Sequence, residues 1–170
     1  MALPGAFTSA VKTPYGKTGF SKKADATGYE IVVDSKGKLL WKDASGMDKP
    51  YLIITSEQVS KEYLDYLEGQ HISRIAVGKD KPDLAAASEI LAEKFGISRM
   101  AVVGGSVINT VFLTAGLLDE ISILMGAGID GRGGMHAVFD GLDMNSKVIP
   151  LTLDSVQKFQ SGAVWLRYRV

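Results

Sequence analysis

From Tyr29 onward, short apolar runs alternate with helical patterns, and this alternation restricts the possible folds more than any other feature. The apolar runs have the length and β-branched character of buried strands, whereas the segments between them repeat apolar residues at helical spacing. The strand candidates are residues 29–33, 51–54, 72–77, 100–103, 121–123, 148–153 and 163–170. Strands that alternate with helices predict an α/β fold with a mostly parallel central sheet, and the last strands predict an antiparallel C-terminal hairpin.

The ends of the helical patterns carry recognisable signals. Thr55 and Ser56 offer hydroxyls that could cap a first helix, and Gln58 has the spacing of a capping box with Thr55. A second helix is expected after Pro82, and Gly96 is expected to end it. Its apolar stripe consists of Leu84, Ala87, Leu91 and Phe95. A third helix should follow the glycine pair at 104–105.

A single domain over residues 1–170 accommodates these elements, because a chain of 170 residues can build one sizeable core. Residues 1–28 are rich in Gly, Pro, Ser, Thr and Lys and show no sustained period. Such composition predicts irregular, peripheral structure for 1–28. Residues 29–170 are then the expected core.

Composition excludes several classes of function. The chain has no cysteine, which rules out disulfides, thiolate catalysis and cysteine-based zinc sites. Its formal net charge is zero, so the basic surface of a typical nucleic-acid-binding protein is missing. No signal sequence and no apolar run of about 20 residues is apparent, which predicts a cytoplasmic protein without a membrane partner. His71 and His136 are too isolated to predict a metal site.

The strongest chemical signal is the segment 101–109, where an apolar run leads into Gly104-Gly105 and then a helical pattern. Backbone N–H groups and the positive end of a helix would meet there, and glycine lets a pyrophosphate approach the backbone closely. Ser106 could add a hydroxyl donor. A tight strand-to-helix turn without a ligand explains the glycine pair equally well.

Residues 104–109, together with 115–120 (Ala-Gly-Leu-Leu-Asp-Glu), resemble the signature of the RibD C-terminal reductase family. That family has a dihydrofolate-reductase-like three-layer fold. Segments 32–35, 50–56, 83–84 and 162–168 agree with the family pattern in the same order. The resemblance covers roughly residues 29–170.

The resemblance implies an NADPH-dependent oxidoreductase that transfers a hydride to a small heterocyclic or carbonyl substrate. The family members on which this expectation is based are the 5-amino-6-(5-phosphoribosylamino)uracil reductases of riboflavin biosynthesis. It further implies a homodimer. The residues that it assigns to the cofactor pyrophosphate are Gly104, Gly105, Ser106 and Val107. Thr55 and Ser56 resemble family residues near the adenosine half of NADPH, and simple N-capping of a helix is the alternative role for them. Asp34-Ser35 is a weaker candidate for the same role, and a plain turn is its alternative.

Two departures from the family pattern affect the substrate. The family's initial Thr-Ser-x-Asp-Gly-like strand and Gly-Arg-x-Thr loop are not found, so the chain is expected to be an N-terminally incomplete form or to have an unusual start. Val103 stands where riboflavin-pathway reductases commonly carry a glutamate that would bind a polar pyrimidine. A nucleotide-binding or structural relic without catalysis is therefore the alternative function.

Three further groups of residues have structural explanations that we prefer. Asp119-Glu120 is expected to cap a turn or to pair with a cation rather than to act as an acid–base pair. The glycine-rich segment 126–134 with Arg132 could clamp an anion, but a connecting loop is the simpler reading. Lysines 36, 38 and 79 are candidates for a 2′-phosphate contact, although lysines on loops usually face solvent.

Overall fold

Two sets of strands make up the protein, one in each of two compact units. The computed structural model describes residues 2–170; the first unit ends at Met100, and the second comprises residues 101–170. Whether the units together form the single domain expected from the sequence remains a prediction.

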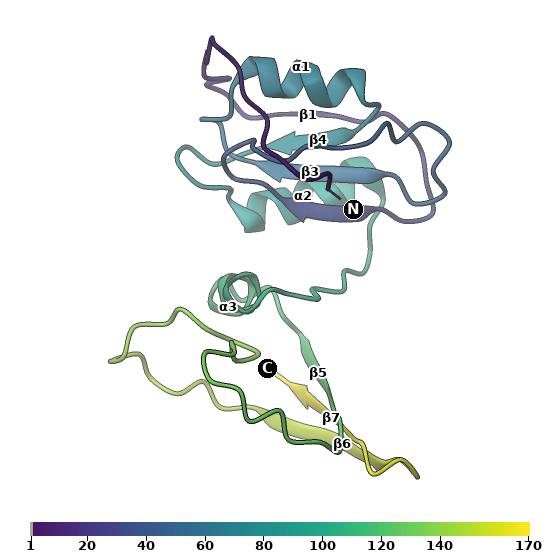
Figure 1. Ribbon diagram of the computed structural model, residues 1–170, viewed down its shortest axis with the longest axis vertical. Coiled ribbons are helices and arrows are strands. Elements are labelled where there is room, and N and C mark those ends of the chain that lie inside the picture. Colours follow the sequence, from purple (N-terminus) through teal and green to yellow (C-terminus); the bar gives the residue numbers. More distant parts are fainter. Residues whose placement is uncertain (1) are drawn as a thin grey trace. The chain divides into compact units, whose positions relative to one another are not determined.

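The first unit is built on a four-stranded sheet with the order β1-β4-β3-β2. The strands are β1 (Gly19–Ser21), β2 (Glu30–Val33), β3 (Tyr51–Thr55) and β4 (Ser73–Ala76). β2, β3 and β4 are parallel, as expected, while β1 pairs with β4 in the antiparallel direction. Helices α1 (Lys61–Gly69) and α2 (Leu84–Phe95) lie on opposite faces of this sheet (Figure 1). The unit is therefore a three-layer α/β/α structure.

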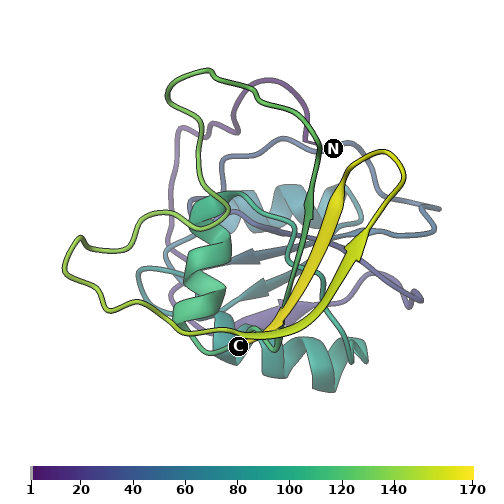
Figure 2. The same ribbon diagram turned by 90° about the horizontal axis from the view of Figure 1, so that it is seen from below.

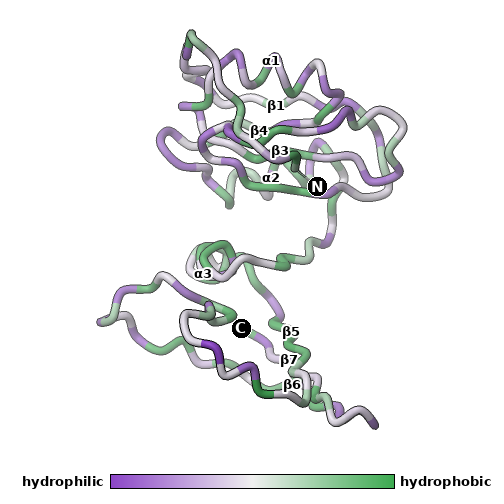
Figure 3. Tube along the Cα trace, in the orientation of Figure 1, coloured by the Kyte–Doolittle hydropathy of each residue, from purple (hydrophilic) through white to green (hydrophobic). Residues whose placement is uncertain are grey.

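One hydrophobic cluster of this unit lies between α1 and the sheet. Tyr51 and Ile53 of β3 pack with Tyr63 and Leu67 of α1, and all four side chains are buried. The hydropathy trace of α1 in Figure 3 alternates accordingly between hydrophilic and hydrophobic residues. Burial of one such side chain contributes about 1.5–3 kcal/mol to folding.

The apolar stripe predicted for the second helix is confirmed in α2. Leu84, Ala87, Leu91 and Phe95 are its buried residues. Gly96 ends the helix in the left-handed conformation, with φ of 69°, which glycine adopts without steric cost. The N-cap is Asp83, whose side chain accepts a hydrogen bond from the backbone N–H of Ala86 at 3.0 Å.

The predicted start of the first helix was wrong. Thr55 still belongs to β3, in register with Ala76, and α1 begins only at Lys61. Ser60 is the N-cap, and its Oγ accepts a hydrogen bond from the N–H of Tyr63 at 3.2 Å. The apparent capping box at Thr55 failed because sheet pairing extends to that residue and a turn follows it.

Ser60→Ala should lower the free energy of unfolding by about 1 kcal/mol, because the N–H of Tyr63 would lose its side-chain acceptor and keep only the carbonyl of Ser60. Urea denaturation of the full chain measures this difference. Ser45→Ala, in an exposed turn outside any helix, is the control for loss of a serine hydroxyl. Equal losses for the two variants would contradict the assignment of Ser60 as the cap.

The N-terminal segment forms more hydrogen bonds with the rest of the first unit than its composition suggested. The expectation of irregular structure over 1–28 missed β1, which is short and lacks an apolar run. Residues before β1 are also tied to the unit by backbone hydrogen bonds. Leu3 donates to the carbonyl of Leu40 at 2.7 Å, and Tyr15 donates to that of Val59 at 2.8 Å. These contacts join residues far apart in sequence, which a local pattern does not reveal.

The second unit contains helix α3 (Ser106–Thr114) and a three-stranded antiparallel sheet with the order β5-β7-β6. Its strands are β5 (Glu120–Met125), β6 (Thr152–Lys158) and β7 (Val164–Arg169). β6 and β7 form the expected C-terminal hairpin, visible as the yellow-green and yellow strands in Figure 2. This antiparallel sheet shares no strand with the sheet of the first unit.

Two strand predictions in this unit need correction. Residues 100–103 form no strand, because no other strand of the described chain pairs with them. The strand expected at 148–153 instead spans Thr152–Lys158. Its alternating polar residues weakened the sequence signal, and the register shifts between Leu153 and Ser155.

The register of the second sheet separates an apolar face from a polar one. Residues that pair across the strands point to the same face. One face is mainly apolar and carries Ile121, Ile123, Met125, Leu153, Val156, Val164, Leu166 and Tyr168, with Lys158 at its end. The other face carries Trp165 and Arg167 together with Glu120, Ser122 and Leu124.

Candidate functional site

The glycine pair leads directly into α3, as the sequence predicted. Gly104 has φ of 110°, a conformation that favours glycine, and Gly105 is the N-cap with φ of −64°. The peptide bond between them is cis. Among the described residues no side chain caps α3. The N–H groups of Ser106, Val107 and Ile108 therefore lack the intrahelical acceptor that later residues have, and the positive end of the helix dipole lies at the same place.

The backbone at this turn is open. A Cβ built on Gly105 would meet no heavy atom within 4 Å in the described part of the chain. Val103, immediately before the pair, is 94% exposed. The combination of free N–H groups, a helix N-terminus and an unobstructed backbone is suited to a phosphate or pyrophosphate group.

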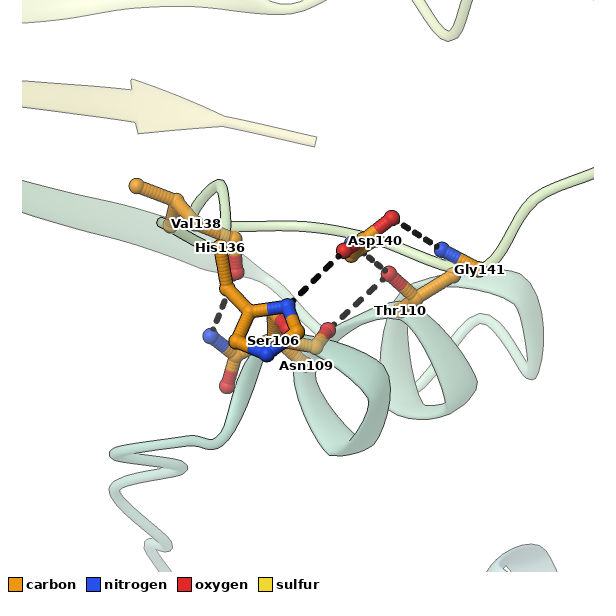
Figure 4. Close-up of polar contacts among 7 residues, drawn as sticks. All are labelled: Ser106, Asn109, Thr110, His136, Val138, Asp140 and Gly141. Atoms are coloured by element: carbon orange, nitrogen blue, oxygen red, sulfur yellow. Dashed lines mark hydrogen bonds and ion pairs between the residues drawn. The ribbon is translucent and has the colours of Figure 1, made fainter. Parts of the chain in front are cut away.

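A loop segment is fixed beside the first two turns of α3 (Figure 4). The amide Nδ2 of Asn109 donates to the carbonyl of Val138 at 2.8 Å. The hydroxyl of Thr110 donates to the carbonyl of Ser106 at 3.1 Å and accepts the N–H of Asp140 at 2.8 Å. These bonds hold the helix start in one position, so the glycine turn is attached to a supported element.

His136 and Asp140 face each other in the same segment, with Nδ1 and Oδ2 3.2 Å apart (Figure 4). The hydrogen bond from His136 lowers the pKa of the Asp140 carboxyl, and the N–H of Gly141 lowers that pKa further. Both side chains are exposed, so the pair contributes little to stability. Residues 2–170 contain no group of three or more His, Cys, Asp or Glu side chains that could hold a metal ion.

Thr55 and Ser56 lie in the first unit, at the carboxyl end of β3, and both are fully buried. The Ser56 hydroxyl donates to the carbonyl of Ser35 and accepts the N–H of Gln58, both at 3.3 Å. It therefore links two loops at the carboxyl ends of β2 and β3. The hydroxyl of Thr55 is unpartnered within the described chain.

Asp34 has a structural role in the turn after β2, in agreement with the alternative interpretation given for it above. Its Oδ2 accepts the N–H groups of Lys38 and Leu39, each at 2.8 Å, and the hydroxyl of Tyr63 at 2.9 Å. Sequence reasoning missed this network, because the aromatic partner comes from α1. Burial raises the pKa of the Tyr63 hydroxyl well above its ordinary value, and the Asp34 carboxylate adds to that shift.

The predicted cofactor residues thus fall into two groups, one in each unit. Gly104, Gly105, Ser106 and Val107 are brought together at the start of α3. Thr55 and Ser56 are adjacent at the end of β3, in the other unit.

Two of the charged residues singled out in the sequence, Glu120 and Arg132, are engaged in ion pairs. Glu120 forms a two-point contact with Arg167, at 3.0 Å to Nε and 2.6 Å to Nη2, across β5 and β7. This pairing agrees with the structural reading of Asp119-Glu120. Arg132 pairs with Asp130 of its own glycine-rich loop, where Nη2 lies 2.7 Å from Oδ2. None of the helices in residues 2–170 combines the length and hydrophobicity that crossing a membrane requires.

Known proteins match this chain over most of its length. A model of the RibD C-terminal domain matches residues 5–165, which includes much of the N-terminal segment that the sequence resemblance left out. The chain is similar in structure to a pyrimidine reductase-like protein from Corynebacterium diphtheriae, at 15% identity and a TM-score of 0.68, covering 82% of this chain and 60% of that one. It is also similar to RibD from Acinetobacter baumannii in form 2, at 18% identity and a TM-score of 0.59, covering 82% of this chain and 36% of that one.

The chain therefore spans less than two thirds of the length of either protein. At these identities the likeness concerns the fold. It confirms the dihydrofolate-reductase-like α/β class predicted from the sequence.

Proposed function

This chain belongs to the RibD C-terminal domain family, and we propose that it is a pyridine-nucleotide-dependent reductase that uses NADPH. The observation that carries the proposal is the uncapped start of α3 behind Gly104 and Gly105. Its N–H groups and helix dipole are suited to a pyrophosphate, the group that a dinucleotide places at such a turn. The family match indicates the reductase class of reaction.

In this proposal the protein residues bind and orient, because a bound nicotinamide dinucleotide would supply the hydride. The N–H groups of Ser106 and Val107 would hold the pyrophosphate, with Gly105 leaving space for its approach. Asn109 and Thr110 would keep the start of α3 in place through the bonds to Val138 and Asp140. Such pre-organisation lowers the cost of binding.

The proposed substrate is a small heterocyclic or carbonyl compound. Val103 offers an exposed aliphatic side chain beside the glycine turn. Riboflavin-pathway reductases commonly carry a glutamate at this position, whose carboxylate would bind a polar pyrimidine. This favours a less polar acceptor than the riboflavin-pathway pyrimidine. It also favours the alternative function, nucleotide binding without catalysis. An assay that monitors the absorbance of NADPH in the presence of candidate acceptors distinguishes the two functions. A reductase would oxidise NADPH, whereas a protein that only binds the nucleotide would not.

A homodimer is part of the proposal. The apolar face of the β5-β7-β6 sheet supports it, because Met125, Leu153 and Val156 on that face are each more than half exposed. Exposed apolar patches of this kind commonly mark association surfaces, and a symmetric dimer is the commonest soluble assembly.

Gly105→Trp should weaken NADPH binding at least tenfold, or about 1.4 kcal/mol, because the indole would fill the position of the pyrophosphate. Isothermal calorimetry on the full chain measures the affinity, which we expect near 1 µM, or about −8 kcal/mol, for the unchanged protein. NADH is titrated in parallel to test the preference for the 2′-phosphate.

Gly133→Trp is the matched control, since Gly133 also lies in the second unit and a Cβ there meets no described atom within 4 Å. It should leave the affinity unchanged. Failure of the unchanged, folded protein to bind either dinucleotide would overturn the proposal and leave the glycine turn with a purely architectural role.

A further inference from the structure

His136 is connected to the start of α3 by a chain of three polar contacts (Figure 4). Its Nδ1 lies 3.2 Å from Oδ2 of Asp140. The backbone N–H of Asp140 donates to the hydroxyl of Thr110 at 2.8 Å, and that hydroxyl donates to the carbonyl of Ser106 at 3.1 Å. Ser106 is the first residue of the helix. The imidazole is therefore attached to the element on which the glycine turn ends.

No other side chain that can carry a positive charge is connected to α3 in this way within residues 101–170. The arginines of this unit pair with carboxylates of their own loop or sheet: Arg132 with Asp130, Arg167 with Glu120 and Arg169 with Asp154. Lys147 and Lys158 form no ion pair in the described part of the chain. The remaining acid of the loop, Asp143, accepts the N–H of Asn145 at 2.8 Å. The charge beside the helix start is thus set by the pair His136 and Asp140.

This pair changes its net charge when the imidazole gains or loses a proton. The hydrogen bonds from His136 and from the N–H of Gly141 lower the pKa of Asp140, which keeps that group a carboxylate. With a protonated imidazole the pair is neutral, and with an unprotonated one it carries one negative charge. α3 itself, from Ser106 to Thr114, contains no charged residue that would offset the change.

The pair is open to a ligand. The side chains of His136 and Asp140 are 79% and 50% exposed, and Nε2 of His136 has no hydrogen-bond partner within residues 2–170. The segment also reaches the first turn of α3, because a Cβ built on Gly141 would lie 3.9 Å from Cγ2 of Val107. The three contacts place the imidazole within two screening lengths of Ser106, each about 8 Å at physiological ionic strength.

We infer that His136, oriented by Asp140, is the cationic residue that binds the pyrophosphate of the dinucleotide. The inference rests on the proposed function, because it takes the start of α3 as the pyrophosphate site. A pyrophosphate is doubly negative, whereas the end of a helix supplies only about half a positive charge. A protonated imidazole adds a full charge and a free N–H donor at Nε2. The carboxylate on Nδ1 fixes the ring, as it does for many functional histidines.

Binding should therefore be coupled to protonation of His136. At about 8 Å in water, one unit charge changes the affinity for a doubly charged group about fivefold. Isothermal calorimetry with NADP⁺, which unlike NADPH is stable in acid, measures Kd of the full chain at about pH 5.5 and about pH 8, on either side of the ordinary histidine range. The unchanged protein should bind more tightly at the lower pH.

His136→Gln removes the titration and keeps an amide donor that can reach Asp140. The ratio of Kd between the two pH values should be about fivefold smaller in this variant than in the unchanged protein. The comparison cancels the titration of the 2′-phosphate of NADP⁺ itself. Near neutral pH the variant should also take up about 0.4 fewer protons per bound NADP⁺, from calorimetry in two buffers of different ionisation enthalpy. A residue that only supports the loop would not alter this proton count.

His71→Gln is the matched control, because His71 is the other histidine of the chain. It lies in the first unit, and its Nδ1 is 3.4 Å from Oδ2 of Asp43, so it forms the same kind of pair. This variant should keep both the pH dependence and the proton uptake of the unchanged protein. NAD⁺, which lacks the 2′-phosphate, is titrated in parallel and should show the same fivefold difference.

The possible failures are distinguishable. If NADP⁺ binds and the pH dependence is the same in the unchanged protein and in His136→Gln, the role of His136 is wrong and the proposed function stands. A difference seen with NADP⁺ but not with bound NAD⁺ would assign His136 to the 2′-phosphate and overturn its assignment to the pyrophosphate. A folded, unchanged protein that binds no dinucleotide at either pH would overturn the proposed function and this inference together.

Discussion

Gly78→Ala is expected to lower the free energy of unfolding by about 3 kcal/mol or more. Gly78 follows β4 with φ of 85°, a conformation that costs about 1–2 kcal/mol for a residue with a side chain. A Cβ there would lie 2.2 Å from the carbonyl oxygen of Lys81 and 2.6 Å from the nitrogen of Asp83. Both are backbone atoms, and Asp83 is the N-cap of α2, so the contact cannot be relieved by a rotamer change.

Gly46→Ala separates the two contributions. Gly46 also has a positive φ, 72°, but a Cβ at that position meets no described atom within 4 Å. The control should therefore cost only about 1–2 kcal/mol. Urea denaturation of both variants gives the comparison. Similar losses at the two positions would mean that the 78–83 turn can rearrange, and that the close approach at Gly78 does not matter.

Tyr63→Ala should cost about 3–5 kcal/mol, the range for removal of a fully buried aromatic side chain. Tyr63→Phe isolates the hydroxyl, which accepts the indole N–H of Trp41 at 3.0 Å and donates to Asp34 at 2.9 Å. Its loss leaves a buried donor and a buried carboxylate with one partner fewer, at a cost of about 1–3 kcal/mol. Urea denaturation measures both changes.

Tyr29→Phe is the control for loss of a tyrosine hydroxyl, since that hydroxyl bonds the carbonyl of Ala24 at an exposed position. It should cost no more than about 1 kcal/mol. The raised pKa of Tyr63 adds a pH dependence: stability is fully present below the ordinary tyrosine value of about 10 and falls as pH rises above it, where only the unfolded chain ionises. Tyr63→Phe should be less sensitive to pH in that range. An unchanged alkaline dependence would argue against this assignment.

The elements with the clearest local patterns were predictable from the sequence. The buried strands at 51–54 and 72–77 were found because their apolar, β-branched runs are short and compact, and the stripe of α2 was found because its apolar residues repeat at helical spacing. Gly96 was identified as a helix end for a steric reason that operates locally. β1 was missed because its three residues carry no period and depend on pairing with β4. The segment 100–103 has strand-like residues, but a strand also requires a partner.

The candidate site was predictable to a similar extent. Gly104, Gly105 and the start of α3 could be placed because glycine and helix signals are adjacent in the sequence. The contacts that support them could not: Val138 and Asp140 lie about 30 residues further along, in a loop without periodicity.

The position of β1 has a consequence for aggregation. β4 has β3 on one side and β1 on the other, so both of its backbone edges are paired. Without β1, the N–H and C=O groups of a hydrophobic strand would form an open edge, the kind of surface on which another chain can add a strand. β1 is itself a poor template, because it is short and its flanks carry Lys17, Lys22 and Lys23. The N-terminal segment therefore covers the β4 edge of the parallel sheet, while β2 forms its opposite edge.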